Sequence, residues 1–428
     1  RHEDKYLMER RAAVTPQHAK QLVDKGLHVL VESSLKRVFK DEEYQEAGAE
    51  LSNDITKSDV VFGVKEMPMD IFEDQKTYIF FSHTIKGQEY NMPLLNKMIE
   101  KKINLIEYEK IADDNNRRLI FFGRFAGLAG MINSLWSFGL RMQEKGIETP
   151  FTKLKQSHKY DSLEQAKKDI KAVGQEIREN GLAKELQPIV IGITGYGNVA
   201  KGAMEIADLL PITEISPEEL NDLSNTTSLP SNVLYRVTFK ERHISKLKEG
   251  NEIFNLQDYY DHPEKYENNF EQYIPHLSIL MNCMYWDDNY PRIVTKSFLK
   301  DLYQNGEPKL KVIGDVTCDP DGSIEATHKG TEIEDPIFVY DPITDKHRMG
   351  SQGDGVLIMS VDILPSELPR DSSIAFGDAL LDYVEAIVVC DYRKSFDELE
   401  LPAPIKKAMI LHNGEFTPDF KYMKDFIK

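Results

Sequence analysis

The sequence predicts an α/β protein built on doubly wound, mostly parallel sheets, and three observations support this fold class. Strand and helix patterns alternate through residues 16–108. A glycine-rich turn follows an apolar, β-branched segment at 189–194 and precedes a helical pattern. The 428 residues, 41% of them hydrophobic, are enough for two or three domains with large cores.

The alternation begins with a helix expected at 16–26, where Thr15 is the N-cap, Pro16 lies in the first turn and Gly26 ends the helix. Further strands are expected at 28–32, 59–64, 77–82 and 104–108, and further helices at 41–48 and 93–102. Two long helical patterns follow at 126–145 and 162–180. The first of these two is a candidate connector between domains, with an ordinary core helix as the alternative.

The second half of the chain carries weaker patterns. Strands are expected at 212–215, 278–283 and 311–316, a polar surface insertion at 216–231, and a helix at 376–386. The short apolar tract 386–390 is interpreted as a buried strand.

Charge and cysteine usage exclude several classes of protein. The net charge of −18, without basic clusters, argues against nucleic-acid binding. No apolar run approaches the roughly 18 residues that a membrane helix needs. The three cysteines are far apart, so neither a disulfide framework nor a metal site is predicted, and a reducing compartment is favoured. Because the sequence starts with Arg1, we expect that an upstream segment was removed.

The glycine-rich turn has the pattern Gly-x-Gly-x-x-Ala of a dinucleotide-binding unit. Gly195 allows the tight turn, Gly197 lets the backbone approach a pyrophosphate, and Ala200 lets the helix pack on its strand. The helix N-terminus then offers free N–H groups to the phosphates. The alternative is a tight turn in some other α/β protein. The residues expected to contact the cofactor here are Gly195, Tyr196, Gly197, Asn198 and Val199.

Polar residues follow three of the early strands, where ligands bind in open α/β sheets. Lys65 follows the strand at 59–64, His83 follows the strand at 77–82, and Glu107 and Glu109 end the strand beginning at 104. Burial and cationic neighbours suit a lysine to proton transfer near neutral pH, where histidine already titrates. The alternatives are a lysine that reaches solvent and a structural histidine.

Two arginine doublets are candidate anion clamps, because guanidinium groups bind carboxylates through two hydrogen bonds. They are Arg10-Arg11 and Arg117-Arg118. A doublet that is simply a solvated surface feature is the alternative.

With these residues in view, nearly the whole chain resembles the lysine–2-oxoglutarate reductase half of the bifunctional aminoadipic semialdehyde synthases. The first motif, 9–16, also resembles the start of alanine dehydrogenases and transhydrogenases. The more specific motifs are Gly63-Val64-Lys65, 80–88, Asn91-Met92, 122–127, 195–203, 360–365 and Leu368-Pro369.

The resemblance implies a reductive condensation, the first step of lysine degradation. The ε-amine of L-lysine joins the ketone of 2-oxoglutarate, and a nicotinamide hydride reduces the resulting imine to saccharopine. Lys65 and His83 match a lysine and a histidine that act as acid and base in the related lysine-forming saccharopine dehydrogenases, and which does which stays open. The matching substrate-binding positions are Arg11, Glu66, Lys86, Glu109, Arg118 and Asp315, of which the two arginines would hold carboxylates.

The cofactor expectation draws on two opposing signals. Glu214 ends a strand nineteen residues after Gly195, which fits a ribose 2′-hydroxyl and hence NAD. The family resembled usually prefers NADPH in animals and plants, and Lys240 and Arg242 could bind the 2′-phosphate. We therefore expect NADPH, with NADH less favoured.

The resemblance also implies two Rossmann-like domains facing each other across a cleft. We expect a substrate and catalytic domain formed by 1–128 and 326–428, and a dinucleotide-binding domain at 129–325. The full-length protein is expected to carry a saccharopine dehydrogenase domain and to form a homo-oligomer. The expected location is the mitochondrial matrix, or the cytoplasm if the source is plant-like.

Three other functions fit parts of the pattern. The first is a lysine-forming saccharopine dehydrogenase, which runs the same chemistry in the oxidative direction with NAD. The second is an alanine dehydrogenase, which does not account for the motif around Lys86. The third is a catalytically silent nucleotide sensor, against which the motifs of Lys65 and His83 argue.

Overall fold

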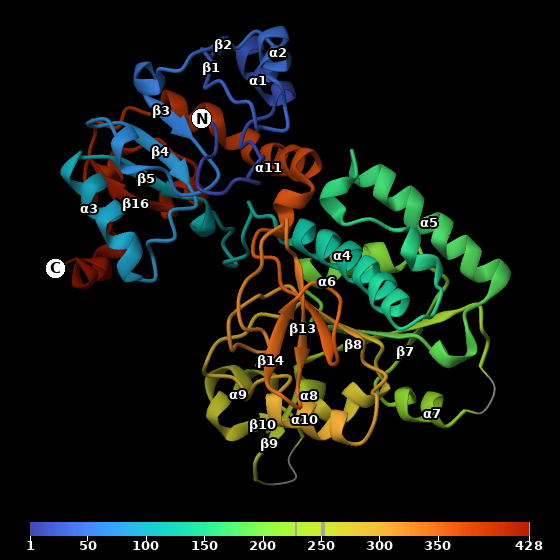
Figure 1. Ribbon diagram of the computed structural model, residues 1–428. Helices are drawn as coiled ribbons and strands as arrows, with labels where there is room; N and C mark the ends of the chain where they lie inside the picture. The colour runs from blue at the N-terminus through green and yellow to red at the C-terminus, as the bar shows by residue number, and fades with distance from the viewer. Residues whose placement is uncertain (227–228, 250–252, 428) are drawn as a thin grey trace. The chain divides into compact units, whose positions relative to one another are not determined.

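The computed structural model describes residues 1–226, 229–249 and 253–427, and the chain divides into two compact units. Unit 1 comprises 1–122 and 369–428, and unit 2 comprises 123–368. In Figure 1, unit 1 holds both the blue N-terminal and the red C-terminal segments. The chain thus leaves unit 1 once and returns once. The return comes later than the expected residue 326, because residues 337–359 complete the sheet of unit 2.

The main sheet of unit 1 has five strands in the order β17-β16-β5-β4-β3. Its parallel strands are β3 (Val60–Phe62), β4 (Thr77–Phe80) and β5 (Asn104–Glu107), and β16 (Met409–His412) and β17 (Glu415–Phe416) add antiparallel pairs. The short strands β1 (Leu30–Val31) and β2 (Glu50–Leu51) form a separate parallel pair. The strands predicted up to residue 108 are therefore confirmed, each shorter than expected, together with one strand that the pattern missed.

Helices cover both faces of the unit 1 sheet. They are α1 (Pro16–Asp24), α2 (Asp41–Glu46), α3 (Met92–Glu100), α11 (Pro369–Val389) and α12 (Ala403–Lys407), with a long 3-10 segment at Pro418–Phe426. Helix α3 packs on one face with Phe80 and Leu105, and α11 packs on the other with Ile79 and Ile106.

The buried strand expected at 386–390 is wrong, because α11 runs on to Val389. Phe376, Leu380, Val384 and Ile387 are all buried at helical spacing. A short apolar run at the end of a helix cannot be told from a strand by composition alone.

Unit 2 contains an eight-stranded sheet in the order β14-β13-β15-β12-β11-β6-β8-β7. Six strands run parallel: β6 (Val190–Thr194), β7 (Ile212–Ile215), β8 (Leu234–Phe239), β11 (Ile279–Asn282), β12 (Val312–Asp315) and β15 (Val356–Met359). At one edge β13 (Ile337–Asp341) and β14 (Lys346–Met349) add antiparallel. Strands β9 (Ser245–Leu247) and β10 (Tyr266–Asn268) form a separate hairpin.

Two layers of helices flank this sheet (Figure 1). They are α4 (Gly123–Glu144), α5 (Leu163–Asn180), α6 (Asn198–Ala207), α7 (Glu219–Asn225), α8 (Glu241–Ile244), α9 (Leu256–Asp261) and α10 (Lys296–Gln304). The expected insertion at 216–231 contains α7, and its residues 227–228 lie outside the described part of the chain. Helix α4 lies wholly in unit 2 and is buried along most of its length, so the core-helix interpretation fits and the interpretation as a connector between domains does not.

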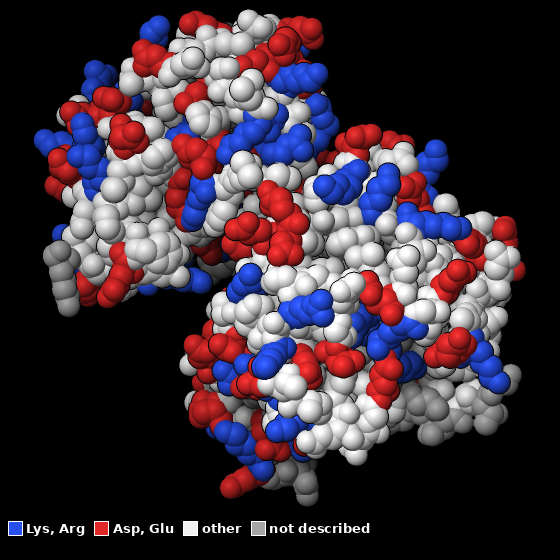
Figure 2. Space-filling model, in the orientation of Figure 1, with Lys and Arg blue, Asp and Glu red and all other residues white. Residues whose placement is uncertain are grey.

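Two features of the structure concern the charged side chains on its surface and the hydrophobicity of its helices. Acidic and basic side chains intermingle on the face drawn in Figure 2, as a solvated surface requires. Within the described ranges, no helix combines the length and the apolar character needed to cross a membrane.

Helices α4 and α6 approach each other so closely that their backbones touch. A side-chain carbon at Gly127 would overlap the carbonyl oxygen of Val199, and one at Gly202 would overlap the carbonyl oxygen of Arg124. Glycine is therefore needed at both positions because of the close approach, whatever its conformation. This contact explains one glycine in each of two motifs that the sequence analysis singled out, Gly127 in 122–127 and Gly202 in 195–203.

We expect Gly127→Ala to lower the free energy of unfolding by about 2 kcal/mol or more, because the new methyl group meets backbone that cannot turn aside. Gly197→Ala is the matched control, since a side-chain carbon there meets no heavy atom within 4 Å. Urea unfolding of both variants checks this expectation. Equal stability of the two variants would contradict it.

Candidate functional site

In unit 1, the carboxyl ends of three adjacent parallel strands bring the predicted acid–base residues to one edge. Strand β3 is followed by Lys65, β4 by His83, and Glu107 ends β5. The N–H of Phe81 donates to the carbonyl oxygen of Val64 at 3.0 Å, so the chain segments that follow β3 and β4 stay hydrogen-bonded to each other past the ends of the two strands. His83 has a φ of +52°, an uncommon backbone conformation for a residue other than glycine. Such strained positions are a feature of functional sites.

The His83 imidazole is held by a buried carboxylate. Its Nδ1 lies 2.7 Å from Oε1 of Glu66, and the same oxygen lies 2.6 Å from Nζ of Lys5. Burial opposes ionisation, but the hydrogen bonds from His83 and Lys5 lower the pKa of Glu66 to about 2. Glu66 is therefore a carboxylate that only accepts hydrogen bonds, and Nδ1 of His83 must carry the proton. Nε2 is then the ring nitrogen that can exchange a proton with a substrate.

Lys65 lies beside the same group of residues. Its Nζ is 5.8 Å from the ring centre of Tyr6, and Nζ of Lys5 is 5.3 Å from that ring. The backbone N–H of Lys65 donates to Oε2 of Glu3 at 2.8 Å. The sequence analysis missed Glu3, Lys5 and Tyr6, because a short irregular segment with no periodicity offers no pattern to interpret. Their only signal is that they precede the 9–16 motif.

Glu107 adds a second buried carboxyl next to His83. It accepts hydrogen bonds at Oε2 from the N–H and the hydroxyl of Ser82, at 2.8 and 2.5 Å. Burial raises the pKa of Glu107 to about 7, against these hydrogen bonds and the charge of His83. This carboxyl can therefore exchange a proton near neutral pH.

Each of the two arginine positions expected to hold carboxylates has an acidic partner within unit 1. Arg11 donates to both oxygens of Glu9, at 2.8 and 2.6 Å, and its guanidinium lies 4.1 Å from the ring centre of Phe122. Arg118 forms an ion pair with Glu109. A dicarboxylate substrate would have to share these guanidinium groups with the two glutamates, so substrate binding by Arg11, Arg118 and Glu109 stays a prediction.

Arg10 and Arg117, the other members of the two doublets, make contacts of their own. Arg10 donates to the carbonyl oxygen of Lys36 at 3.2 Å. Arg117 pairs with Asp113 at 2.8 Å on the surface. Neither contact involves the strand ends that carry Lys65 and His83, so the surface alternative fits these two residues.

Two further residues were expected to bind substrate. Lys86 is exposed on the turn before Gly87. Asp315 ends β12 in unit 2, where it is completely buried and accepts hydrogen bonds from Asn282, Thr317 and Thr327 at 2.7 to 2.9 Å. These bonds order the strand ends of unit 2, and substrate binding by Lys86 and Asp315 stays a prediction.

In unit 2, the glycine turn has the geometry expected for a dinucleotide. Gly195 has a φ of +85°, and Gly197 faces open space at the N-terminus of α6. Tyr196 and Asn198 are exposed beside it, Val199 is half-buried, and Ala200 is buried. A cavity of about 430 Å³ lies against this turn. Its aromatic lining residues are Tyr196, Tyr259, Tyr260, Tyr285, Trp286 and Tyr290.

The strand order changes which acidic residue faces the turn. Strand β8, not β7, is the neighbour of β6, and Glu214 on the edge strand β7 pairs with Arg236 at 2.7 Å. The topological reason for placing Glu214 at a ribose therefore falls away. Glu241 follows the end of β8 instead, lines the cavity, and accepts hydrogen bonds from the hydroxyls of Tyr196 and Tyr260 at 3.3 and 3.0 Å. The sequence analysis missed it because it did not expect β8, and it took the acidic residue from the next strand that it did expect, 212–215.

The two basic residues expected at a 2′-phosphate flank Glu241. Nζ of Lys240 lies 5.7 Å from the ring centre of Tyr196 in the glycine turn. Arg242 is exposed, and its Nε lies 3.1 Å from Nε2 of His243. The end of β8 thus presents one acidic and two basic side chains in sequence, with Lys240 beside the turn.

We expect Glu66→Gln to lower the free energy of unfolding by about 2 kcal/mol at pH 7, because Lys5 and His83 lose their shared carboxylate. A depressed pKa stabilises the folded state above the ordinary glutamate pKa of 4.5, and this contribution is lost as the pH falls toward 2. The difference between wild type and variant should therefore shrink by roughly half by pH 3 in urea unfolding. Asp24→Asn, in an exposed pair with Lys20, should change stability by less than about 1 kcal/mol. A pH-independent difference for Glu66→Gln would refute this account.

Comparisons with known proteins agree with this fold. Two family models match: alanine dehydrogenase/PNT, N-terminal domain, over residues 1–129, and alanine dehydrogenase/PNT, C-terminal domain, over 184–419. A solved L-alanine dehydrogenase superposes with a TM-score of 0.61 at 16% identity, covering 100% of this chain and 98% of its own.

Curated relatives have higher sequence identity. Alpha-aminoadipic semialdehyde synthases of Arabidopsis thaliana and Mus musculus, the latter named mitochondrial, are each 36% identical over 97% and 99% of this chain. The chain spans 40% and 47% of their length. A saccharopine dehydrogenase [NAD(+), L-lysine-forming] of Emericella nidulans is 28% identical over 87% of both chains. The matched models, relatives and fold agree, and the chain belongs to the alanine dehydrogenase/PNT family.

Proposed function

We propose that this chain is a lysine–2-oxoglutarate reductase, which condenses L-lysine with 2-oxoglutarate and reduces the product to saccharopine with NADPH. The observation that carries the proposal is the group of Lys65, His83, Glu66 and Lys5 at the strand ends of unit 1. The names of the 36% identical relatives support the substrate class. In the longer protein, a saccharopine dehydrogenase domain would consume the product, and the mitochondrial matrix is the proposed compartment.

The chemistry needs two proton transfers, and unit 1 offers groups for both. Attack of the lysine ε-amine on the ketone requires loss of a proton from nitrogen, and departure of water requires a proton on the carbinolamine oxygen. Nε2 of His83, oriented by Glu66, and Nζ of Lys65 are the groups proposed for these transfers. Arg11 and Arg118 would hold the substrate carboxylates by exchanging partners with Glu9 and Glu109.

The residues of unit 2 fit a nicotinamide nucleotide. Gly197 leaves open space at the N-terminus of α6 for a pyrophosphate, and the aromatic cavity beside the turn suits an adenine ring. NADPH, when bound, supplies the hydride that reduces the imine. Lys240 and Arg242 are proposed to bind its 2′-phosphate, and Glu241 would bind a ribose hydroxyl where that phosphate is absent.

A lysine-forming saccharopine dehydrogenase that uses NAD is the second candidate. The position of Glu241 favours it, because an acidic residue after the strand beside the glycine turn suits an unphosphorylated ribose. The Emericella nidulans relative, which carries that name, spans most of the same chain. The same proton transfers serve both directions, so cofactor preference separates the two candidates.

We expect the purified chain to oxidise NADPH only when L-lysine and 2-oxoglutarate are both present. Lys65→Met should lower kcat by about 10²- to 10⁴-fold, because a proton-transfer group is lost. Lys97→Met removes a half-buried lysine that pairs with Glu100 on α3 and should leave kcat unchanged. Absorbance of NADPH at saturating substrates provides the measurement.

Three results would contradict these expectations. Activity only with saccharopine and NAD would establish the second candidate. No activity in either direction would favour a nucleotide sensor. Full activity of Lys65→Met would remove Lys65 from the proton transfers.

Cofactor choice can be tested at the end of β8. We expect Lys240→Gln and Arg242→Gln each to raise the KM for NADPH about tenfold relative to NADH, since each removes a charge from the proposed phosphate site. Glu241→Gln should raise the KM for NADH instead. Lys246→Gln, in a pair with Glu267 on the β9–β10 hairpin, is the control. An unchanged KM ratio in all three variants would place cofactor selection elsewhere.

A further inference from the structure

Glu3 is a buried carboxyl in unit 1 that the proposed reaction does not use. Its side chain is buried, with the residue 5% exposed. Oε1 accepts a hydrogen bond from the N–H of Val64 at 2.7 Å, and Oε2 accepts one from the N–H of Lys65 at 2.8 Å. The Glu3 carboxylate therefore accepts the two backbone hydrogen bonds, from Val64 and Lys65, that a neighbouring strand would otherwise accept.

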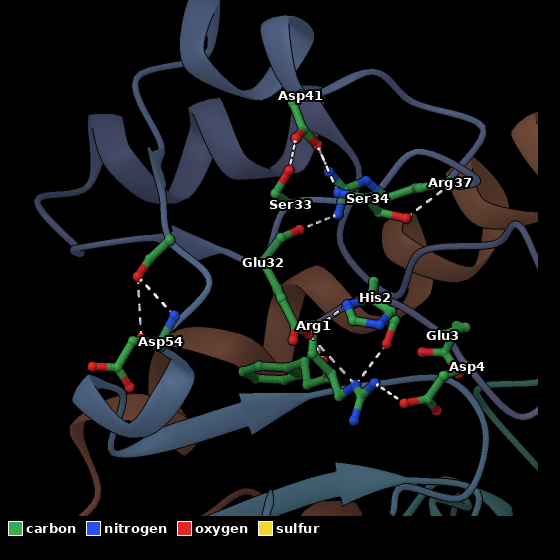
Figure 3. A network of polar contacts seen from close by, with 12 residues as sticks. Arg1, His2, Glu3, Asp4, Glu32, Ser33, Ser34, Arg37, Asp41 and Asp54 are labelled. Atoms are coloured by element: carbon green, nitrogen blue, oxygen red, sulfur yellow. Dashed lines mark hydrogen bonds and ion pairs between the residues drawn. The ribbon is translucent and has the colours of Figure 1, made fainter.

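The segment that carries Glu3 is itself anchored. The amino nitrogen of Arg1 donates to the carbonyl oxygen of Phe62 at 2.8 Å, and the N–H of His2 donates to Glu32 at 3.0 Å. Figure 3 shows Glu32 between His2 and Arg37, and Arg37 donates to the Glu32 carbonyl oxygen at 2.8 Å. Glu3 is thus presented to the end of β3 from a fixed backbone, so its two hydrogen bonds can restrain Lys65.

The end of β3 is shaped to receive this carboxylate. Gly63 precedes Val64, and a side-chain carbon there would lie 2.5 Å from Cε of Met67 and 3.5 Å from Oε1 of Glu3. An alanine at this position would displace the end of the Met67 side chain, whereas its distance to the carboxylate would be an ordinary van der Waals contact. Gly63 therefore leaves room for Met67 beside the carboxylate.

We propose that Glu3 is a positioning residue, whose buried carboxylate fixes the backbone of Lys65 and thereby the reach of its ammonium group. This inference rests on the proposed role of Lys65 in proton transfer. An ionised carboxylate accepts both N–H groups, whereas a protonated one must use one oxygen to carry its own hydrogen. The restraint on Lys65 therefore depends on the charge of Glu3.

The surroundings of Glu3 place that charge change near neutral pH. Burial, and then the nearby Glu9, raise its pKa to about 7, while the N–H groups of Lys65 and Val64 oppose the shift. The buried phenol of Tyr108 also interacts with Glu3. Because the folded pKa lies above the ordinary value of 4.5, protonated Glu3 is favoured in the folded state as pH falls below 7. At about pH 7 half of the Glu3 side chains are ionised, so the restraint on Lys65 strengthens above that pH and weakens below it.

The test compares Glu3→Gln with Asp4→Asn. Glutamine mimics the protonated acid, because it keeps one acceptor oxygen and presents an NH₂ group to the second N–H. We expect kcat at pH 8 to fall roughly ten- to a hundredfold in Glu3→Gln, with little change in KM. The difference in kcat between this variant and the wild type should be smaller at pH 6. Glu3→Asp keeps the charge and should restore part of kcat. Asp4 pairs with Arg1 at 2.7 Å in the same segment, and Asp4→Asn should match wild type.

A second measurement needs neither a variant nor turnover. In the wild-type protein, hydrogen exchange should show protection factors of the Val64 and Lys65 amides that fall between pH 8 and pH 6. The amide of Gly63, which donates to the carbonyl oxygen of Ile79 at 3.0 Å, should keep its protection. Constant protection at all three amides, or a Glu3→Gln variant with wild-type kcat and pH profile, would overturn the inference. Loss of the proposed function alone would leave the exchange result intact, so the two failures can be told apart.

Discussion

The arrangement of unit 1 depends on the compensation of buried charge. Four glutamates, Glu3, Glu9, Glu66 and Glu107, are removed from water at or beside one edge of a small sheet. Each is stabilised differently: Glu3 by backbone N–H groups, Glu9 by two hydrogen bonds from a guanidinium, Glu66 by a lysine and a histidine, and Glu107 by a serine. An uncompensated carboxylate in this position would cost several kcal/mol. These partners therefore limit which side chains the strand ends can carry, and they orient the ones that are there.

The same requirement gives the proposed acid and base different surroundings. His83 is oriented through a side chain, because Glu66 binds its Nδ1, whereas Lys65 is restrained through its backbone. The His83 ring has a fixed tautomer, whereas Lys65 is a flexible side chain on a fixed backbone, and the two arrangements serve different purposes. The first provides a proton at a defined point in space, and the second can follow a substrate whose geometry changes during the reaction.

Much of the fold could be predicted from the sequence, because periodicity reports burial. Four strands of unit 1 up to residue 108, the long helices and the glycine turn carried local signals and were found, whereas the two-residue strand β2 was missed. The positions of Lys65 and His83 at strand ends were predictable for the same reason, and their role in proton transfer stays a prediction. Glu241 and the return point at 369 were not, because both depend on strand order, which local pattern does not encode. Glu3 and Lys5 lie in irregular backbone, where only the folded chain shows what they meet.

The backbone contact between α4 and α6 has a mechanical consequence. Gly127 and Gly202 leave no side-chain layer between the two helices, so there is nothing compressible to absorb a small displacement. Helix α4 starts at Gly123, the first residue of unit 2, and α6 starts at Asn198, directly after the glycine turn. We therefore expect the two helices to move together. A displacement where the chain enters unit 2 would then shift the turn that is proposed to hold the cofactor.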